Sequence, residues 1–417
     1  MRLMLWRRLV PAAILAMIGG AAMGEGFVTA QGATLMLDGR EYRAVGVNVP
    51  HLHQAYLGTW FHVREKYGTP EQAREAVIAA LQDAERSGLQ FIRFFADPGY
   101  PSDRAMLYDK DPEAYWRGMD QLFALCRQHH LKLVPSLQTI PGPYLYYGER
   151  GQAILDPNSK TYEAEHRYIR EFVTRYQDDP TVLMWELMNE GMLHADVEME
   201  GRKLLPAGVY PPGMPVREDG AMTDSLTWDM FQRLYREHAA LIKSLDPNHL
   251  VTSGDAGVRP ECTSRRETFP NFRFRFDAWR EWLGNNLLSQ PAPLDVFSFH
   301  FYGSDEVAGP DVPWAGMTTL EQMRGVVRCV HAANAPVFIG ELGAWPNNQT
   351  DPHGAWLCKC LDAMEAEGVS LIALWVWHFN WQPEFTMDSA TYPEVVTRAK
   401  AFNARHAIAA GRSLAAE

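Results

Sequence analysis

Eight repeats of a short apolar segment followed by an amphipathic helical segment predict an α/β protein, a closed (β/α)8 barrel. The apolar segments are continuous rather than alternating, which is typical of parallel strands buried on both faces. Two of them, 182–190 and 336–341, end in a glutamate. The carboxyl ends of barrel strands share one rim, where functional residues gather, so these glutamates predict a reactive site there.

The order of the elements follows from their apolar spacing. Residues 27–45 predict a small β-hairpin system with turns at Gly32 and at Asp38–Gly39. A doubly wound open sheet is the alternative fold, and it is disfavoured because no glycine-rich nucleotide loop follows the first strand. Barrel strands are expected at 44–49, 89–95, 131–137, 182–190, 250–253, 296–300, 337–340 and 369–377, and helices at 69–87, 112–129, 161–176, 226–245, 272–288, 320–333, 355–367 and 393–406.

The N-terminus resembles an export signal. Arg2, Arg7 and Arg8 precede a short apolar stretch at 10–23 that is rich in Gly and Ala, too short for a comfortable membrane span. We therefore expect cleavage of residues 1–24, a secreted or periplasmic protein and no stable membrane insertion after cleavage.

The rest of the chain predicts a catalytic domain over 25–408 and a short tail over 409–417. The formal net charge of −12, without a basic stripe, argues against nucleic acid as a partner. We expect a monomer.

The chain has five cysteines, so they cannot form a complete set of disulfides. Cys329 could pair with Cys358 or Cys360, although buried free thiols are the favoured interpretation. The cysteine spacings do not resemble a zinc site, and no metal or organic cofactor is expected.

Polar and aromatic side chains gather where the predicted strands end. Each one alone has a structural explanation, such as a buried ion pair or a core histidine, but together they point to one site at the rim. The set is Arg93, Asn189, Glu190, His300, Tyr302, Glu341, Trp375 and Trp377.

At these positions the sequence resembles glycoside hydrolase family 5, of the clan A retaining barrel enzymes. The family's Asn-Glu matches Asn189-Glu190, its His-x-Tyr matches His300 to Tyr302, and its strand-seven glutamate matches Glu341. Its strand-two arginine and strand-eight tryptophan match Arg93 and Trp375. The chain departs from the family at two positions, which bear on subfamily and substrate: Gln138 replaces a common His, and Gly191 replaces a common Pro.

The resemblance implies that Glu190 is the acid/base and Glu341 the nucleophile, with their carboxyl groups at the retaining separation of about 5–5.5 Å. It implies that Arg93 and Tyr302 keep Glu341 ionised and that Asn189 binds the sugar 2-hydroxyl. His300 would hydrogen-bond Glu190 or a sugar hydroxyl. Trp375 would form the floor of the reactive subsite, with Trp377 beside it. Aromatic residues expected to stack on sugars in the loops are Trp60, Tyr144, Trp314, Trp345 and Trp381.

The sequence therefore predicts an exported endo-β-1,4-glycanase that acts on β-mannan or β-glucan. An exo-acting β-glycosidase is the alternative if 191–225 and 256–290 close one end of the cleft. A carbohydrate-binding barrel without catalysis is disfavoured because both glutamates are present. A metal hydrolase would rest on His194 and Asp196 alone, and no Gly-x-Ser-x-Gly motif supports an esterase.

Overall fold

The computed structural model of the protein describes residues 26–59, 62–98, 103–138, 143–149, 151–197, 226–269 and 274–407. The predicted signal, the tail from 409, Trp60 and most of the 191–225 segment lie outside the described residues. The fold is an eight-stranded parallel barrel preceded by a small antiparallel sheet, as predicted.

The antiparallel sheet comprises β1 (Thr29–Gln31), β2 (Thr34–Leu37) and β3 (Arg40–Glu41). Its residues Val28, Leu35 and Tyr42 belong to the same apolar cluster as the side chains inside the barrel. The sheet therefore covers the end of the barrel opposite the rim that carries the candidate site.

The barrel strands pair in parallel in the order β8-β7-β6-β5-β4-β11-β10-β9. A bridge between Thr252 and Val296 joins the two outermost strands and nearly closes the barrel. The strands are β4 (Ala44–Asn48), β5 (Phe91–Phe95), β6 (Lys132–Gln138), β7 (Met184–Met188), β8 (Leu250–Thr252), β9 (Phe297–Gly303), β10 (Val337–Ala344) and β11 (Leu371–Leu374).

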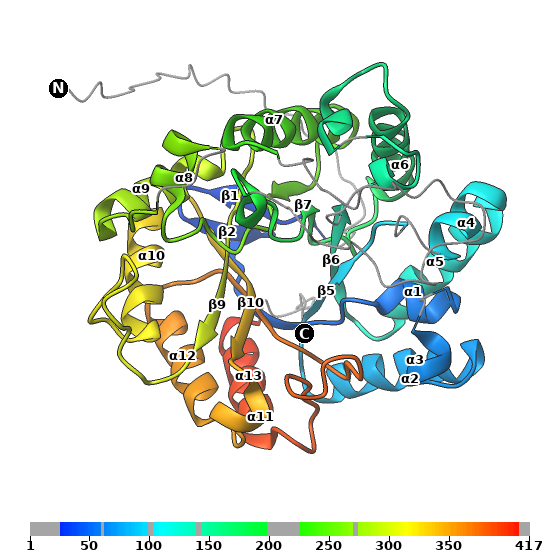
Figure 1. Ribbon diagram of the computed structural model, residues 1–417. Helices are drawn as coiled ribbons and strands as arrows, with labels where there is room; N and C mark the ends of the chain where they lie inside the picture. Colours follow the sequence, from blue (N-terminus) through cyan, green and yellow to red (C-terminus); the bar gives the residue numbers. More distant parts are fainter. Residues whose placement is uncertain are drawn as a thin grey trace, which may run out of the picture.

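Helices form a ring outside the strands (Figure 1). Those that follow the barrel strands are α3 (Pro70–Arg86), α5 (Pro112–Gln128), α6 (Lys160–Tyr176), α7 (Trp228–Leu245), α9 (Trp279–Ser289), α10 (Thr319–Ala332), α12 (Ala355–Ala366) and α13 (Pro393–His406). Short helices in the connections are α1 (Leu52–Leu57), α2 (Val63–Lys66), α4 (Asp103–Lys110), α8 (Cys262–Thr268) and α11 (Asn347–Thr350), with 3-10 turns η1 (Pro143–Leu145), η2 (Gly151–Leu155) and η3 (Gly191–His194).

Two apolar clusters stabilise this arrangement. The inner one fills the barrel with side chains such as Phe91, Met184 and Phe338. The outer one lies between strands and helices and takes alternate strand residues such as Ile92, Trp185 and Ile339. Because successive strand residues point to opposite faces, the two clusters interleave along every strand.

The structure corrects some predicted boundaries. The helix predicted at 272–288 begins only at Trp279, because Glu281 accepts a hydrogen bond from the Ala278 N–H and pairs with Arg275, which together fix the helix start. Strands β9 and β10 extend past the predicted ends to Gly303 and Ala344, and β11 ends earlier than predicted.

All five cysteines are free thiols in the structure, so neither Cys358 nor Cys360 pairs with Cys329. Among the helices of the described ranges, none is long and apolar enough to cross a membrane.

Candidate active site

A bulge in β10 directs Glu341 into the mouth of the barrel. Strict alternation from Ile339, which faces the helices, would turn residue 341 outward as well. The pairing of β10 with β9 shifts at Gly340, so that Ile339 lies opposite Phe299 while Glu341 lies opposite His300. The extra residue changes the phase of the strand and brings Glu341 to the inner face.

Arg93 is the centre of the buried polar network below this rim. Its Nε and Nη2 donate to the two carboxylate oxygens of Glu186, each at 2.8 Å. Its Nη1 donates to Glu341 at 2.8 Å and to Asn48 at 3.0 Å, and its Nη2 also donates to Asn189 at 2.7 Å. Burial alone would lower the pKa of Arg93, but Glu186 and Glu341 outweigh it and raise the pKa, so the guanidinium is charged.

The two glutamates predicted as the reactive pair lie on either side of His300. His300 Nδ1 is 2.9 Å from a carboxylate oxygen of Glu190 and 3.6 Å from one of Glu341. An oxygen of each glutamate and a ring nitrogen of His300 all lie within 4.8 Å of one another. The hydroxyl of Tyr302 donates to the second oxygen of Glu341. The structure thus brings together residues from β5, β7, β9 and β10.

Burial dominates the protonation of the pair. It raises the pKa of Glu190, against the opposing charges of Arg93 and Arg259. It also raises the pKa of Glu341, although His300, Arg93 and Tyr302 oppose this shift. The expected contacts of Arg93 and Tyr302 with Glu341 are present, but they do not bring its pKa below the ordinary value.

The nearby Glu190 carboxylate adds to the rise in the pKa of Glu341, because two adjacent anions repel each other. Burial lowers the pKa of His300 to about 4, so its ring is uncharged at neutral pH. The charged guanidinium of Arg93 contacts Glu341 but not Glu190. The guanidinium therefore favours the anion of Glu341 over that of Glu190, whose side chain is 30% exposed.

A tight turn after β7 presents Glu190. Its φ of 56° lies in the left-handed region, which is unusual for a residue other than glycine. The Glu190 N–H donates to the carbonyl of Gly254 at 2.9 Å, and the Met192 N–H donates to Asp255 at 2.9 Å. The Asp255 carboxyl also accepts from the Tyr235 hydroxyl at 2.7 Å. The loop after β8 therefore fixes the backbone that carries Glu190.

Aromatic side chains line the rim beside Glu341. Trp375 is almost buried and packs edge-on to Tyr302, with ring centroids 6.5 Å apart. Trp345 is 64% exposed, and its ring also lies edge-on to Tyr302 at 5.4 Å. Trp381 is 46% exposed and packs against Phe379 at 6.0 Å, which in turn contacts Trp375 at 6.4 Å. Two exposed indoles are thus connected to the site through ring contacts.

The profile of the cellulase family, glycosyl hydrolase family 5, matches residues 152–380, which is more than half of the chain. The chain belongs to glycosyl hydrolase family 5. This confirms the resemblance seen in the sequence, and the matched region carries both glutamates together with Trp345 and Trp375.

Similar curated proteins are mannan endo-1,4-beta-mannosidases. The chain is 28% identical over 302 residues to mannan endo-1,4-beta-mannosidase 7 of Arabidopsis thaliana, covering 66% of this chain and 58% of that protein. It is 28% identical over 278 residues to the probable mannan endo-1,4-beta-mannosidase C of Aspergillus terreus, covering 58% and 59%. The matches span about three fifths of the length of these relatives.

Solved structures share the fold. The endo-1,4-beta-mannanase of Rhizomucor miehei superposes with a TM-score of 0.58 at 18% identity, covering 91% of this chain and 100% of that one. The beta-glucanase SdGluc5_26A of Saccharophagus degradans, in complex with cellotetraose, superposes with a TM-score of 0.52 at 16% identity, covering 91% and 95%.

Trp377 does not belong to this family 5 site, and the prediction for it is corrected. Its side chain is fully buried, and its indole N–H donates to the carbonyl of Ala80 in α3 at 3.1 Å. Residues 375 and 377 would share a face if the strand continued, but β11 ends at Leu374, so alternation no longer applies.

Other predicted residues have structural partners. Tyr144 is buried, and Trp314 packs on Trp282 with ring centroids 4.8 Å apart, so neither matches the expectation of an open sugar platform. Asp196 accepts hydrogen bonds from the Trp228 N–H at the start of α7, which explains it without a metal. Gln138, at the position of a common family histidine, donates to the buried carboxyl of Glu165 on α6.

Sequence reasoning missed Glu186, Asn48 and Asp255. A signal existed for Glu186, since a charge inside an apolar strand requires a buried partner. Asn48 ends β4 and connects three strands, because its side-chain amide also donates to the Gly340 carbonyl at 2.8 Å. No spacing in the sequence distinguishes Asp255 from an ordinary loop aspartate.

Glu190, His300 and Glu341 are close enough to ligate a metal ion. The donors around them favour a different use: Arg93 donates to one oxygen of Glu341 and Tyr302 to the other. A guanidinium and a hydroxyl aimed at the same carboxylate compete with a cation for its lone pairs. The cluster therefore fits a pair of reactive carboxyls better than a metal centre.

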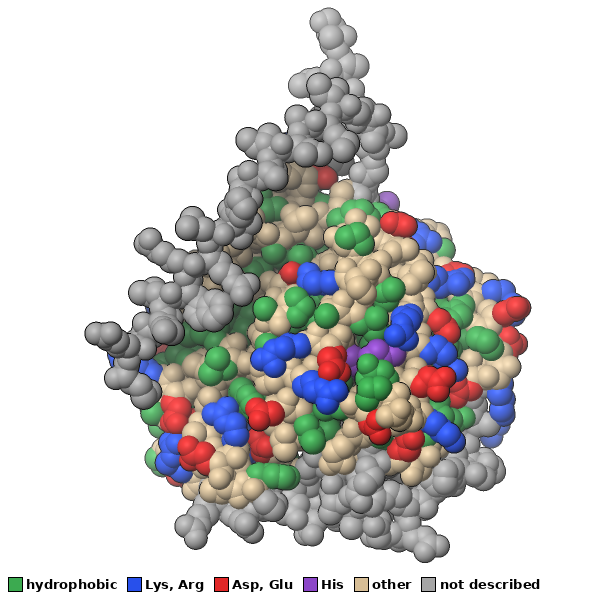
Figure 2. All heavy atoms as spheres, turned by 90° about the horizontal axis from the view of Figure 1, so that it is seen from above, with side chains coloured by type: hydrophobic (Ala, Val, Ile, Leu, Met, Phe, Trp, Pro, Cys, Tyr) green, Lys and Arg blue, Asp and Glu red, His purple; other side chains and the backbone are tan. Residues whose placement is uncertain are grey.

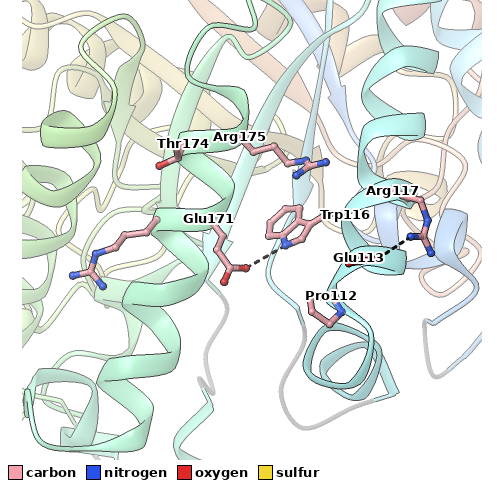
Figure 3. Close-up of a pocket in the computed structure, with 8 residues that line it drawn as sticks. Pro112, Glu113, Trp116, Arg117, Glu171, Thr174 and Arg175 are labelled. Carbon is pink, nitrogen blue, oxygen red and sulfur yellow. Dashed lines mark hydrogen bonds and ion pairs between the residues drawn. The ribbon is translucent and has the colours of Figure 1, made fainter.

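A hollow of about 820 Å³ lies elsewhere, on the outer surface between α5 and α6 (Figure 3). Several of its polar groups already have partners: the Trp116 indole N–H donates to Glu171 at 3.1 Å, and Arg117 pairs with Glu113 at 3.6 Å. Arg175 pairs with Asp120. This hollow is separate from the glutamate pair, and its chemistry gives no reason to connect the two.

Proposed function

We propose that this family 5 protein is a retaining β-glycoside hydrolase that cleaves internal β-1,4 linkages of mannan. One observation carries the reaction: carboxyl oxygens of Glu190 and Glu341 lie within 4.8 Å of each other at the barrel mouth. An inverting enzyme needs roughly 6.5–9.5 Å between its carboxyl groups to hold a water, whereas a retaining pair is about 5–5.5 Å apart.

The contacts of the pair support its two roles. Burial raises the pKa of Glu190, and its side chain is partly exposed, so it can protonate the leaving oxygen and later activate water as a base. Glu341 lies beside Arg93, which favours its anion, and it can attack the anomeric carbon to form a glycosyl-enzyme. Tyr302 and Arg93 orient its two oxygens, which is the positioning that a nucleophile requires.

Asn189 and Trp375 are suited to hold the reacting sugar. The side-chain oxygen of Asn189 accepts from Arg93, which leaves its NH2 end to donate to a sugar 2-hydroxyl. Such a bond strengthens as the transition state forms. The Trp375 indole N–H donates a hydrogen bond to Gln382 at 3.1 Å, which fixes the ring. The ring can therefore form the floor of the subsite without a change of conformation.

Mannan is favoured because the curated relatives are named mannan endo-1,4-beta-mannosidases. The basic and apolar start of the sequence supports export to a compartment where such a polymer is accessible.

Hydrolysis of β-mannan, carboxymethylcellulose, laminarin and aryl β-glycosides by the purified protein tests this proposal, with Glu341→Ala as the inactive control. We expect mannan to be the best substrate and to yield a range of oligosaccharides with a rapid loss of viscosity. Release of mannose alone would indicate exo action. Preference for a glucan would contradict the proposal that mannan is the substrate. Absence of hydrolysis on all four would overturn the reaction.

A further inference from the structure

A third carboxylate, Glu186, lies beneath the two at the rim. It is in the middle of β7 and fully buried. Both of its oxygens accept from Arg93, from Nε and from Nη2, at 2.8 Å each. This is a bidentate ion pair with no access to solvent, so its geometry is fixed.

Arg93 carries one positive charge but faces two carboxylates. Glu186 takes two of its N–H bonds, and Glu341 takes one at 2.8 Å on the other side of the guanidinium. Asn48 and Asn189 accept the rest and are neutral. The charge that stabilises Glu341 as an anion is therefore offset by Glu186 within the same low-dielectric network.

The loop after β8 leaves room for this third carboxylate. A Cβ at Gly254, which has a φ of 81°, would lie 2.6 Å from both Cγ and Cδ of Glu186. Contacts this close are not tolerated, so glycine at 254 leaves the space that the Glu186 side chain occupies. The same residue supplies the carbonyl that accepts from the Glu190 N–H.

We infer that Glu186 is a charge-balancing positioning residue: it pins the plane of the Arg93 guanidinium and limits how strongly Arg93 stabilises ionised Glu341. A nucleophile held too strongly as an anion is a weaker nucleophile, so the balance tunes Glu341 for attack. The inference rests on the proposed role of Glu341, but the charge sharing itself can be measured without any substrate.

The test is Glu186→Gln, which keeps the shape and removes the charge. Glu341 is then the remaining anion on Arg93, so we expect its pKa to fall by about one unit or more. The readout is a 13C NMR titration of protein labelled at the glutamate side-chain carboxyl, with Glu341→Gln used to assign the resonance. Asp246→Asn is the matched control, because Asp246 is also fully buried but pairs with His249 and Trp185.

A second variant guards against misfolding of the first. Asn48→Asp places an added carboxylate on Nη1 of Arg93, and we expect the pKa of Glu341 to rise. An unchanged Glu341 pKa in Glu186→Gln, or a rise as large as that in Asn48→Asp, would overturn the inference. So would an equal shift in Asp246→Asn.

Activity gives an independent reading of the same variants. If the protein hydrolyses a glycoside, the acid limb of kcat/KM should move to lower pH in Glu186→Gln, which a purely structural role would not produce. If no glycoside is hydrolysed, the proposed function fails, while the NMR titration still decides whether Glu186 balances Arg93.

Discussion

Asp255 illustrates how burial sets the chemistry of a single residue near the site. One of its oxygens accepts from the Met192 N–H and the Tyr235 hydroxyl, and the other has no hydrogen-bond partner among the described residues. Burial, only partly opposed by these two bonds, raises the pKa of Asp255 to about 7. A carboxyl with one unpartnered oxygen prefers the neutral form, because the charge is poorly solvated there.

Stability should therefore fall as Asp255 ionises. The pKa of Asp255 in the folded protein, about 7, lies above the ordinary value of 3.8. Its contribution to the free energy of unfolding is therefore fully present below about pH 4 and is lost as the pH rises through 7. The difference corresponds to about 4 kcal/mol. Relative to Asp255→Asn, the wild-type protein should lose up to this amount between pH 4 and 7.

Urea denaturation of both proteins across this pH range measures the effect, with exposed Asp229→Asn on α7 as control. The free energy of unfolding of the control should change with pH in parallel with that of the wild type. Stability curves of Asp255→Asn and wild type that also run parallel would contradict the prediction.

At the same scale, sequence reasoning located the site residues that lie at strand ends, since apolar strands that end in polar groups are readily recognised. Glu190 and Glu341 were predicted together for this reason. Glu186 was missed because its partner lies 93 positions away in the sequence, and only the closed barrel brings the two together. Trp377 was misplaced because the end of β11 was set too late.

The bulge in β10 is the element on which the glutamate pair depends. Gly340 has no side chain, and a Cβ there would lie 2.7 Å from Nε2 and 3.0 Å from Cδ2 of His300. His300 contacts both glutamates, so any displacement of its ring disturbs the pair.

Gly340→Ala should consequently lower kcat/KM by at least tenfold while the protein stays folded, because the clash is confined to the rim. Gly309→Ala, where a Cβ meets nothing within 4 Å, is the control and should behave like wild type. Initial rates on mannan together with circular dichroism check this. Wild-type activity in Gly340→Ala would show that His300 need not hold this position.

Helices and strands were predicted well where the apolar pattern extends over many residues. They were predicted poorly where local contacts decide where an element begins or ends. All eight barrel strands were foreseen, because each is an apolar run between helices. The bulge was not used, although a glycine inside a strand is a recognised sign of one. The start of α9 at Trp279 depends on the contacts of Glu281, which apolar spacing does not reveal.

For the whole molecule, charge gives little guidance toward a partner. Acidic and basic side chains are intermingled on the face shown in Figure 2. A neutral polysaccharide needs no charged surface and is instead held by stacking and hydrogen bonds. The exposed indoles of Trp345 and Trp381 are the features of the described surface best suited to this.

Replacing either indole should weaken binding of a polymer without harming the fold. With about 1 kcal/mol per stacking contact, Trp345→Ala and Trp381→Ala should each raise KM for mannan about fivefold. A short aryl glycoside should be little affected. Leu288→Ala, an exposed apolar residue on α9, is the matched control. Equal KM values for polymer in all three variants and the wild type would remove both tryptophans from the proposed binding surface.

The most direct test of the central claim is the anomeric configuration of the product first released. Two glutamates with oxygens within 4.8 Å fit the retaining separation better than the inverting one, so hydrolysis should proceed through a glycosyl-enzyme on Glu341. Time-resolved 1H NMR of mannan-oligosaccharide hydrolysis should show the β-anomer first, followed by slow mutarotation to the equilibrium mixture. Initial appearance of the α-anomer would contradict the roles proposed for Glu190 and Glu341 together.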